Sequence, residues 1–319
     1  MQPIAISCGE PAGIGPEIAV AAWRALGKDV PLLWLGDPQH LPAGTKWHSA
    51  TDPADIHPFK FTVLARDFTG PATPGRPDPR HASGVIAAIS DAVALVQSGA
   101  ARAVCTAPIH KAALIDGADF AYPGHTEYLA ALAGVDQVVM MLACDALRVA
   151  PVTIHIPLAE VGDALTARLL TDTLLLTHAA LRRDFGIANP RIAVAGLNPH
   201  AGEDGKMGQE EIEIITPVLN GLRAQGMEIT GPHSADTMFH AGARQRYDVA
   251  VCMYHDQALI PLKTLDFSGG VNVTLGLPFI RTSPDHGTAF DIAGQGVADA
   301  TSMIAAIRMA AEMADARDR

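Results

Sequence analysis

The sequence is poor in features that define several protein classes. Aromatic residues make up only 5% of its 319 residues, and no uninterrupted apolar run reaches the roughly 18 residues that a membrane-spanning helix needs. Positive charge is also scarce, because 34 Asp and Glu against 23 Lys and Arg give a net charge of −11. Nucleic-acid binding needs a basic face that neutralises phosphates. The composition therefore argues against a membrane protein and against a nucleic-acid-binding protein.

The four cysteines lack any pairing motif. They are widely spaced, without a CxxC pattern, and at least two of them lie in apolar runs. We therefore expect buried free thiols and a reducing, cytoplasmic environment. The first residues contain neither the basic region nor the long apolar stretch of a secretion signal, so no such signal is expected.

The pattern that is present is that of an α/β protein. Hydrophobic residues reach 49%, and short apolar runs alternate with longer segments of helical period. Two runs, residues 138–142 and 147–156, predict an antiparallel hairpin within an otherwise parallel sheet. Further strands are expected at residues 3–7, 32–35, 61–65, 103–106, 191–197 and 248–254, and helices at 16–26, 83–99, 165–181 and 298–314.

Three of the thirteen histidines are candidates for a metal site. His155 lies within a predicted strand, whereas His200 and His255 each follow a strand in a polar loop. Imidazoles from separate strand ends can converge on one divalent cation and leave positions open for substrate oxygens. Their wide separation forms no local metal motif, so a metal site and ordinary loop residues both remain open. Four others, in polar or Pro-rich surroundings, are expected at the surface: His40, His48, His57 and His81.

The glycine-rich turn Gly9–Glu17 does not complete either common phosphate-binding motif. It lacks the third glycine of the dinucleotide fingerprint and the Lys-Ser/Thr ending of a P-loop. A tight turn without a ligand is the favoured interpretation. A second turn, Gly124–Glu127, begins a predicted helix. Two interpretations remain open: the free backbone amides of the first helical turn bind an anion, or Thr126 caps the helix.

Isolated polar residues punctuate the last third of the chain. Lys263, Asn272 and Arg281 recur at equal intervals in a largely apolar, Gly-rich segment. A buried cation needs a partner, which a phosphate or carboxylate ligand would supply, while surface exposure is the alternative. The motif His286–Gly296 has small residues that let a ligand approach the backbone, and an acid that could accept a ribose diol. Without a ligand it would be a Gly-rich surface loop.

The motif His286–Gly296 resembles the cofactor loop of the β-decarboxylating dehydrogenases, such as isocitrate and isopropylmalate dehydrogenase. The resemblance implies a two-lobed α/β/α sandwich that is not a Rossmann fold. It also implies that His286, Gly287 and Asp291 hold the adenosine half of the cofactor. A carboxylate at Asp291 would accept both ribose hydroxyls and repel a 2′-phosphate, so NAD is expected rather than NADP.

Nearly the whole chain is similar to the 4-hydroxythreonine-4-phosphate dehydrogenase family of vitamin B6 biosynthesis. The resemblance implies that His155, His200 and His255 bind one divalent cation, which is zinc, magnesium or cobalt. It further implies substrate contacts at His125, Thr126, Lys263, Asn272 and Arg281, with Lys263 as the catalytic candidate for proton transfer and Asp256 and Asp236 as weaker candidates. The stretches that carry it are residues 9–17, 122–127, 196–203, 231–237, 254–258, 272–278 and 281–289.

The same resemblance implies a reaction and an assembly. The family oxidises 4-(phosphooxy)-L-threonine with NAD to 2-amino-3-oxo-4-(phosphooxy)butanoate, which decarboxylates to 3-amino-2-oxopropyl phosphate on the route to pyridoxal 5′-phosphate. It is homodimeric, with the active site completed across the interface. We expect a cofactor lobe of residues 1–127 and 271–319 and a metal-site and dimerisation lobe of residues 128–270. Two alternatives remain: a paralogue acting on 4-phospho-D-threonate or 4-phospho-D-erythronate, and a non-catalytic phosphometabolite-binding protein.

Overall fold

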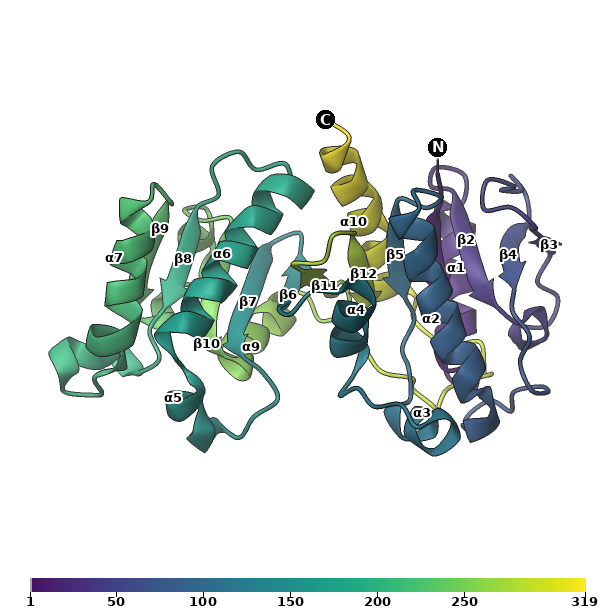
Figure 1. Ribbon diagram of the computed structural model, residues 1–319, viewed down its shortest axis with the longest axis horizontal. Helices are drawn as coiled ribbons and strands as arrows, with labels where there is room; N and C mark the ends of the chain where they lie inside the picture. The colour runs from purple at the N-terminus through teal and green to yellow at the C-terminus, as the bar shows by residue number, and fades with distance from the viewer. Residues whose placement is uncertain (1) are drawn as a thin grey trace. The chain divides into compact units, whose positions relative to one another are not determined.

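The computed structural model describes residues 2–319, and these form two compact units (Figure 1). The first unit contains residues 2–136 and 277–319, and the second contains Gln137–Gly276. Each unit is a sheet with helices packed against it, so the expected α/β class is confirmed. The roles assigned above to a cofactor lobe and a metal lobe stay predictions.

The first unit is built on a parallel sheet. Its strands pair in parallel in the order β3-β4-β2-β1-β5-β12. Every residue of β1, β2 and β5 is buried, as expected for parallel strands that are covered on both faces. This burial explains why these strands stand out in the sequence as continuous apolar runs. The bounds are β1 Ile4–Ser7, β2 Leu32–Gly36, β3 Trp47–Ser49, β4 Phe61–Ala65, β5 Ala103–Thr106 and β12 Arg281–Pro284.

Helices cover both faces of this first sheet. Helix α2 packs on β1, β2 and β5, while α1 and α10 contact each other. Because parallel crossovers are right-handed, α1 and α2 must lie on opposite faces of the sheet (Figure 1). The helices are α1 Gly15–Leu26, α2 Ala82–Gln97, α3 Lys111–Ala118, α4 His125–Ala133 and α10 Thr301–Arg317, with short turns η1 Pro38–His40 and η2 Pro79–His81.

The second unit has a mixed sheet. Its strands follow the order β11-β6-β7-β10-β8-β9, and only β6 is antiparallel to its neighbours. The expected hairpin of β6 and β7 is confirmed. The strand β7 nevertheless ends at Thr153, so His155 follows the strand instead of lying within it, which corrects the expectation from the sequence. The bounds are β6 Val139–Cys144, β7 Leu147–Thr153, β8 Ile192–Ala195, β9 Ile229–His233, β10 Val249–Tyr254 and β11 Val271–Leu275.

The helices of the second unit also form two layers. Helix α6 lies on one face of the sheet and α9 on the other (Figure 1). Under α9, a cluster of buried side chains joins β6, β7, β8 and β10 to Ala258, Leu259 and Leu262. The elements are η3 Leu158–Glu160, α5 Val161–Ala164, α6 Ala167–Asp184, η4 Pro199–Gly205, η5 Glu211–Ile215, α7 Thr216–Ala224, η6 Ala235–Thr237, α8 Ala241–Arg244 and α9 His255–Leu265.

Several smaller expectations can be checked against the burial of side chains. All four cysteines, Cys8, Cys105, Cys144 and Cys252, are free and buried, as expected. His81 is only 1% exposed, so its expected surface position is wrong. Within residues 2–319 no helix combines the length and apolar character needed to cross a membrane.

Candidate active site

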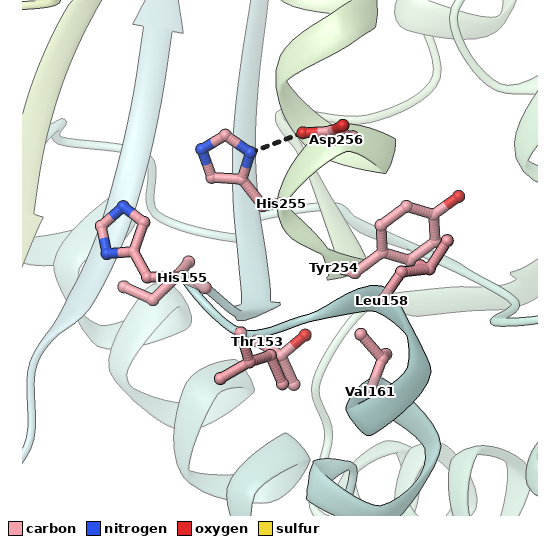
Figure 2. Close-up of a pocket in the computed structure, with 9 residues that line it drawn as sticks. Thr153, His155, Leu158, Val161, Tyr254, His255 and Asp256 are labelled. Carbon is pink, nitrogen blue, oxygen red and sulfur yellow. Dashed lines mark hydrogen bonds and ion pairs between the residues drawn. The ribbon is translucent and has the colours of Figure 1, made fainter.

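Two of the three candidate metal ligands meet at one edge of the second sheet. Strands β7 and β10 are parallel neighbours, with Thr153 opposite Tyr254, so their carboxyl ends lie together. His155 follows β7, and His255 begins α9 directly after β10. The centroids of the two imidazole rings are 5.8 Å apart. Figure 2 shows both rings in a pocket of ≈ 230 Å³, together with the side chain of Asp256.

A carboxylate fixes the orientation of one ring. The Nδ1 atom of His255 lies 2.7 Å from Oδ1 of Asp256 (Figure 2). Because a carboxylate accepts this hydrogen bond, Nδ1 carries the proton and the lone pair of Nε2 is left for a ligand. Histidines that bind metals are usually held in this way by an acidic or carbonyl partner. The donor set of two imidazoles therefore fits a divalent cation of the zinc type.

The backbone at His155 is unusual as well. Its φ is 55°, in the left-handed region that residues other than glycine seldom occupy. Such conformations cost free energy and persist where the surroundings require them, often at functional sites. This turn directs the chain away from β7 and brings the imidazole to the rim of the pocket.

His200 lies apart from this pair within the single chain. It is exposed, begins a run of six residues with positive φ, His200–Gly205, and is absent from the lining of the histidine pocket. The buried carboxylate of Glu211 braces this turn, because it accepts hydrogen bonds from the backbone N–H (2.8 Å) and the side-chain amide (3.0 Å) of Asn198. Across residues 2–319, no three His, Cys, Asp or Glu side chains form a group that could hold a metal ion. One chain thus assembles two of the three predicted ligands.

The second unit also contains two predicted substrate contacts. Lys263 lies on α9, the helix that His255 begins, and its Nζ is 5.4 Å from the ring centroid of Phe267. Asn272 lies in β11, half-buried, and pairs in register with Leu142 of β6. Lys263 is half-buried and does not lie in the core. This position favours a role at the surface of a binding site.

Arg281 is the buried cation that the sequence suggested. It begins β12, is 3% exposed, and its guanidinium donates hydrogen bonds to Oγ1 of Thr106 at 2.7 and 3.2 Å. Burial lowers the pKa of Arg281 to about 10, so the side chain is still charged at neutral pH. The sequence did not predict that Thr106 accepts hydrogen bonds from Arg281. Its position at the end of the buried strand β5, where ligand-binding residues gather in α/β sheets, could have marked it as a candidate.

His125 and Thr126 lie in the first turn of α4. The residue at the N-cap position is Gly124, so the alternative in which Thr126 caps this helix is wrong. The Nε2 atom of His125 is covered and has no hydrogen-bond partner in the protein. Burial, and then the positive charge of Arg281, lower the pKa of His125 well below its usual value, so the ring is neutral. A neutral imidazole and free helix amides near a buried arginine can bind an anionic group.

The loop 286–296 is held in place by the glycine-rich turn at the start of the chain. The backbone N–H of Ile14 donates to the carbonyl of Thr288 at 3.0 Å, and the carboxylate of Glu17 accepts from the backbone N–H of Gly294. A Cβ atom on Gly13 would come within 2.8 Å of the Thr288 carbonyl oxygen, so the contact requires glycine. The turn that matched no phosphate motif therefore supports the predicted cofactor loop.

The predicted cofactor residues differ in their surroundings. His286 places Nδ1 3.0 Å from the carbonyl of Gly287, and its Nε2 is covered without a partner. Asp291 is exposed. Gly294 and Gly296 line a pocket of ≈ 420 Å³ in the first unit, whereas Asp291 is not part of its wall.

Comparison with known proteins places the chain in a family. The model of a family described as pyridoxal phosphate biosynthetic protein PdxA matches residues 31–310. The chain belongs to this family. A protein of Roseobacter denitrificans named 4-hydroxythreonine-4-phosphate dehydrogenase is 65% identical over 316 residues, which is 98% of this chain and 97% of that protein. The resemblance seen in the sequence is confirmed.

Solved structures agree with this membership of the PdxA family. The crystal structure of 4-hydroxythreonine-4-phosphate dehydrogenase from Klebsiella pneumoniae superposes with a TM-score of 0.90 at 40% identity, covering 98% of this chain and 100% of that one. Isocitrate dehydrogenase from Methylococcus capsulatus superposes with a TM-score of 0.52 at 15% identity, over 100% of this chain and 87% of that one. The second likeness shows the fold alone, and it confirms the isocitrate dehydrogenase-like class.

Proposed function

We propose that this protein oxidises 4-(phosphooxy)-L-threonine with NAD to 2-amino-3-oxo-4-(phosphooxy)butanoate, which then loses carbon dioxide to give 3-amino-2-oxopropyl phosphate. Membership of the PdxA family and the name shared by its relatives support the reaction class. The observation that carries the proposal is the pair His155 and His255 in one pocket, with Asp256 orienting the second ring. This arrangement suits a metal-dependent alcohol oxidation.

Three histidines would hold the divalent cation: His155, His200 and His255. When bound, a cation such as zinc, magnesium or cobalt would lower the pKa of the substrate hydroxyl and withdraw electron density during decarboxylation. The protein contributes the ring orientation at His255 through Asp256. It also contributes the apolar side chains of Leu158 and Val161, which line the pocket.

The phosphate group of the substrate is assigned to the first unit. Arg281 offers a buried positive charge, and His125 and Thr126 open the helix α4 close to it. A guanidinium binds phosphate oxygens in a bidentate manner, and helix amides add further donors. Lys263 keeps its proposed role in proton transfer, and Asn272 its role as a substrate contact.

The nicotinamide cofactor is assigned to the loop 286–296. His286, Gly287 and Asp291 would hold its adenosine half, with the carboxylate of Asp291 accepting hydrogen bonds from both ribose hydroxyls. The same charge would repel a 2′-phosphate, so we propose NAD in preference to NADP. When bound, the nicotinamide would supply the hydride acceptor for the oxidation. The free thiols at all four cysteines fit the reducing conditions of a cytoplasmic enzyme.

The active unit is proposed to be a homodimer. In the second unit several large apolar side chains are exposed, including Leu158 (68%), Ile260 (61%) and Phe267 (76%). A second copy that covered these side chains would remove their apolar surface from water, which favours association. Leu158 also lines the histidine pocket, so a second copy bound there could bring its His200 to the pair His155 and His255.

The deciding experiment is a steady-state assay of the purified protein. NADH formation is followed with 4-(phosphooxy)-L-threonine, 4-phospho-D-threonate and 4-phospho-D-erythronate, and kcat/KM is compared. We expect the amino acid to be preferred by at least about tenfold, the discrimination that one hydrogen-bonded substrate group provides. Preference for either sugar acid would support the paralogue, and no turnover of any substrate would support a binding protein. A metal-free sample prepared with a strong chelator should be inactive and recover when zinc, magnesium or cobalt is added.

A further inference from the structure

The pocket of ≈ 420 Å³ in the first unit has walls suited to a flat aromatic ring. It lies beside the loop 286–296, where Gly294 and Gly296 form part of its lining. Most other lining residues are apolar or small, among them Pro11, Leu41 and Pro74. Proline and leucine faces are surfaces on which a planar heterocycle packs well, and binding pockets commonly combine such walls with a few polar groups.

One of those polar groups is a carboxylate with an unused oxygen. Glu17 lines the pocket, and its Oε1 accepts the backbone N–H of Gly294. Its other oxygen, Oε2, is covered and has no hydrogen-bond partner in the protein. A covered charged oxygen without a donor is costly, so a ligand that supplies one is favoured at this position.

A second acceptor without a donor belongs to a residue that lines the same pocket. His40 lines the pocket, and its Nε2 is 3.1 Å from the carbonyl of Gly70. A carbonyl only accepts, so Nε2 carries the ring proton and Nδ1 is an acceptor. Nδ1 is covered and has no partner. Burial lowers the pKa of His40, which keeps the ring in this neutral form.

We propose that this pocket binds the adenine base of the nicotinamide cofactor, and that Glu17 recognises its exocyclic amino group. The proposal rests on the cofactor assignment made above for the loop 286–296. The lining also includes the donor groups of Arg24 and Gln39. The covered acceptors of Glu17 and His40 are the ones without a partner, and a ring that presents an N–H group, as adenine does with its amino group, supplies the missing donor. Hypoxanthine presents a carbonyl oxygen at the same position, and that oxygen would face the Glu17 carboxylate.

Glu17 therefore has two functions at one carboxylate. Oε1 positions the cofactor loop through Gly294, and Oε2 reads the base. The substitution Glu17→Gln separates them, because the Gly294 N–H requires an acceptor and so orients the new amide with its oxygen toward the loop. The amide NH₂ then takes the place of Oε2. An acceptor becomes a donor at the base, while the contact to the loop is kept.

The test compares two cofactors that differ only in this group. Binding of NAD and of nicotinamide hypoxanthine dinucleotide is measured by isothermal titration calorimetry with the wild type, Glu17→Gln and Glu312→Gln, a control at an exposed glutamate of the same unit. The wild type and the control should bind NAD at least about tenfold more tightly, the effect of one charge-assisted hydrogen bond. Glu17→Gln should lose or reverse this preference. The ratio of the two dissociation constants, measured with one protein preparation, does not depend on the fraction of that preparation that is folded and active.

AMP and IMP, measured in the same way, remove the nicotinamide end from the comparison. The same preference for AMP in the wild type, lost in Glu17→Gln, places the discrimination at the base. Equal affinities of the wild type for both dinucleotides, or a preference that survives in Glu17→Gln, would overturn the proposal. A weakening of both ligands by the same factor in Glu17→Gln would also overturn it, because that result assigns Oε2 to the ribose that they share. None of these measurements needs the phosphorylated substrate, so they stand apart from the test of the reaction.

Discussion

The imidazole rings of His155 and His255 lie with their centroids 5.8 Å apart and their planes tilted by 43°, and a neighbouring carboxylate holds the ring of His255. The two rings come from adjacent parallel strands, whose register fixes where each chain leaves the sheet. The hydrogen bond to Asp256 fixes the proton of His255 on Nδ1 and therefore the nitrogen that can bind a metal. The strength of the metal site should depend on this carboxylate.

We therefore predict that Asp256→Asn weakens zinc binding. Loss of the carboxylate makes the His255 ring less basic and less firmly oriented, which typically lowers metal affinity by about 10- to 100-fold. Affinity is measured by competition with a chelating dye. Asp163→Asn, at an exposed acid of the same unit, should bind zinc as the wild type does. Unchanged affinity in Asp256→Asn, alongside a strong loss in His255→Ala, would show that the carboxylate is dispensable.

The separate position of His200 predicts complementation between inactive variants. If His155 and His255 act in one subunit and His200 in the other, a heterodimer of His200→Ala with His255→Ala has one intact site. Random exchange of subunits makes about half of the dimers mixed, so activity should recover to about a quarter of the wild-type value. The measurement is NADH formation after subunit exchange is demonstrated by mass spectrometry.

The matched control combines His155→Ala with His255→Ala. Each site takes both His155 and His255 from one subunit. Each of the two sites in the heterodimer therefore lacks one of these ligands, and activity should stay absent. Recovery in this control would mean that the two facing histidines of one chain serve different sites. No recovery in either pair, with exchange proven, would argue against a site shared between subunits.

The sequence was most informative where burial is uniform. The strands β1, β2, β5 and β10 are covered on both faces, so their apolar runs are visible without any knowledge of the fold. Strands β11 and β12 were missed because they are short and because Asn272 and Arg281 interrupt their apolar pattern. These interruptions are the residues proposed to bind substrate, so local pattern and function conflict there.

The candidate site was predictable in its residue types but not in its grouping. Resemblance supplied His155, His200 and His255, yet only the register of β7 and β10 shows that two of them meet within one chain. The support of the loop 286–296 by Glu17 could not be seen either, since the hydrogen bond joins opposite ends of the sequence. The glycine at position 13 did carry a signal, and the structure shows a cause for it in the close approach to Thr288.

Arg281 should not be replaceable by lysine. Its guanidinium donates two hydrogen bonds to Thr106 from different nitrogens, a forked geometry that an ammonium group cannot reproduce, and the proposed function assigns the substrate phosphate to this side chain. We predict that Arg281→Lys lowers kcat/KM for 4-(phosphooxy)-L-threonine by at least about tenfold, mostly through KM, because a charge-assisted hydrogen bond is lost. The dissociation constant for NAD should stay within about twofold of the wild-type value, because substitutions at distant, independent sites affect each other by only a few tenths of a kcal/mol. An equal loss in both constants would indicate a general structural defect.

Asp291 should set the choice between the two nicotinamide cofactors. Its exposed carboxylate is proposed to accept the ribose hydroxyls and to repel a 2′-phosphate. Asp291→Asn should lower the ratio of kcat/KM for NAD to that for NADP by about tenfold or more, since one charge repulsion is removed. The ratio is measured at fixed substrate concentration and constant ionic strength. If the ratio does not change, another residue determines cofactor choice.

His125 predicts how stability depends on pH. Its folded-state pKa is lowered by burial and by Arg281, while in the unfolded chain it returns to about 6.5. Above that pH both states are neutral and the residue has no effect. Below it the unfolded chain binds a proton that the folded chain excludes, so the free energy of unfolding falls as the pH falls, by up to about 1.4 kcal/mol per pH unit for this one group. His125→Gln removes that difference and should give a flatter dependence.

The comparison must isolate this residue from other histidines. Burial also lowers the pKa values of His40, His178 and His233, so the wild-type curve is a sum over several groups. The relevant quantity is the difference between wild type and His125→Gln in urea unfolding, measured between about pH 5 and pH 8, where histidine titrates. Chelator is present throughout, so that metal-binding histidines contribute equally to both proteins. His240→Gln, at an exposed histidine, should leave the slope unchanged. A wild-type slope in His125→Gln would mean that the ring binds a proton equally in the folded and the unfolded chain, so that folding does not lower its pKa.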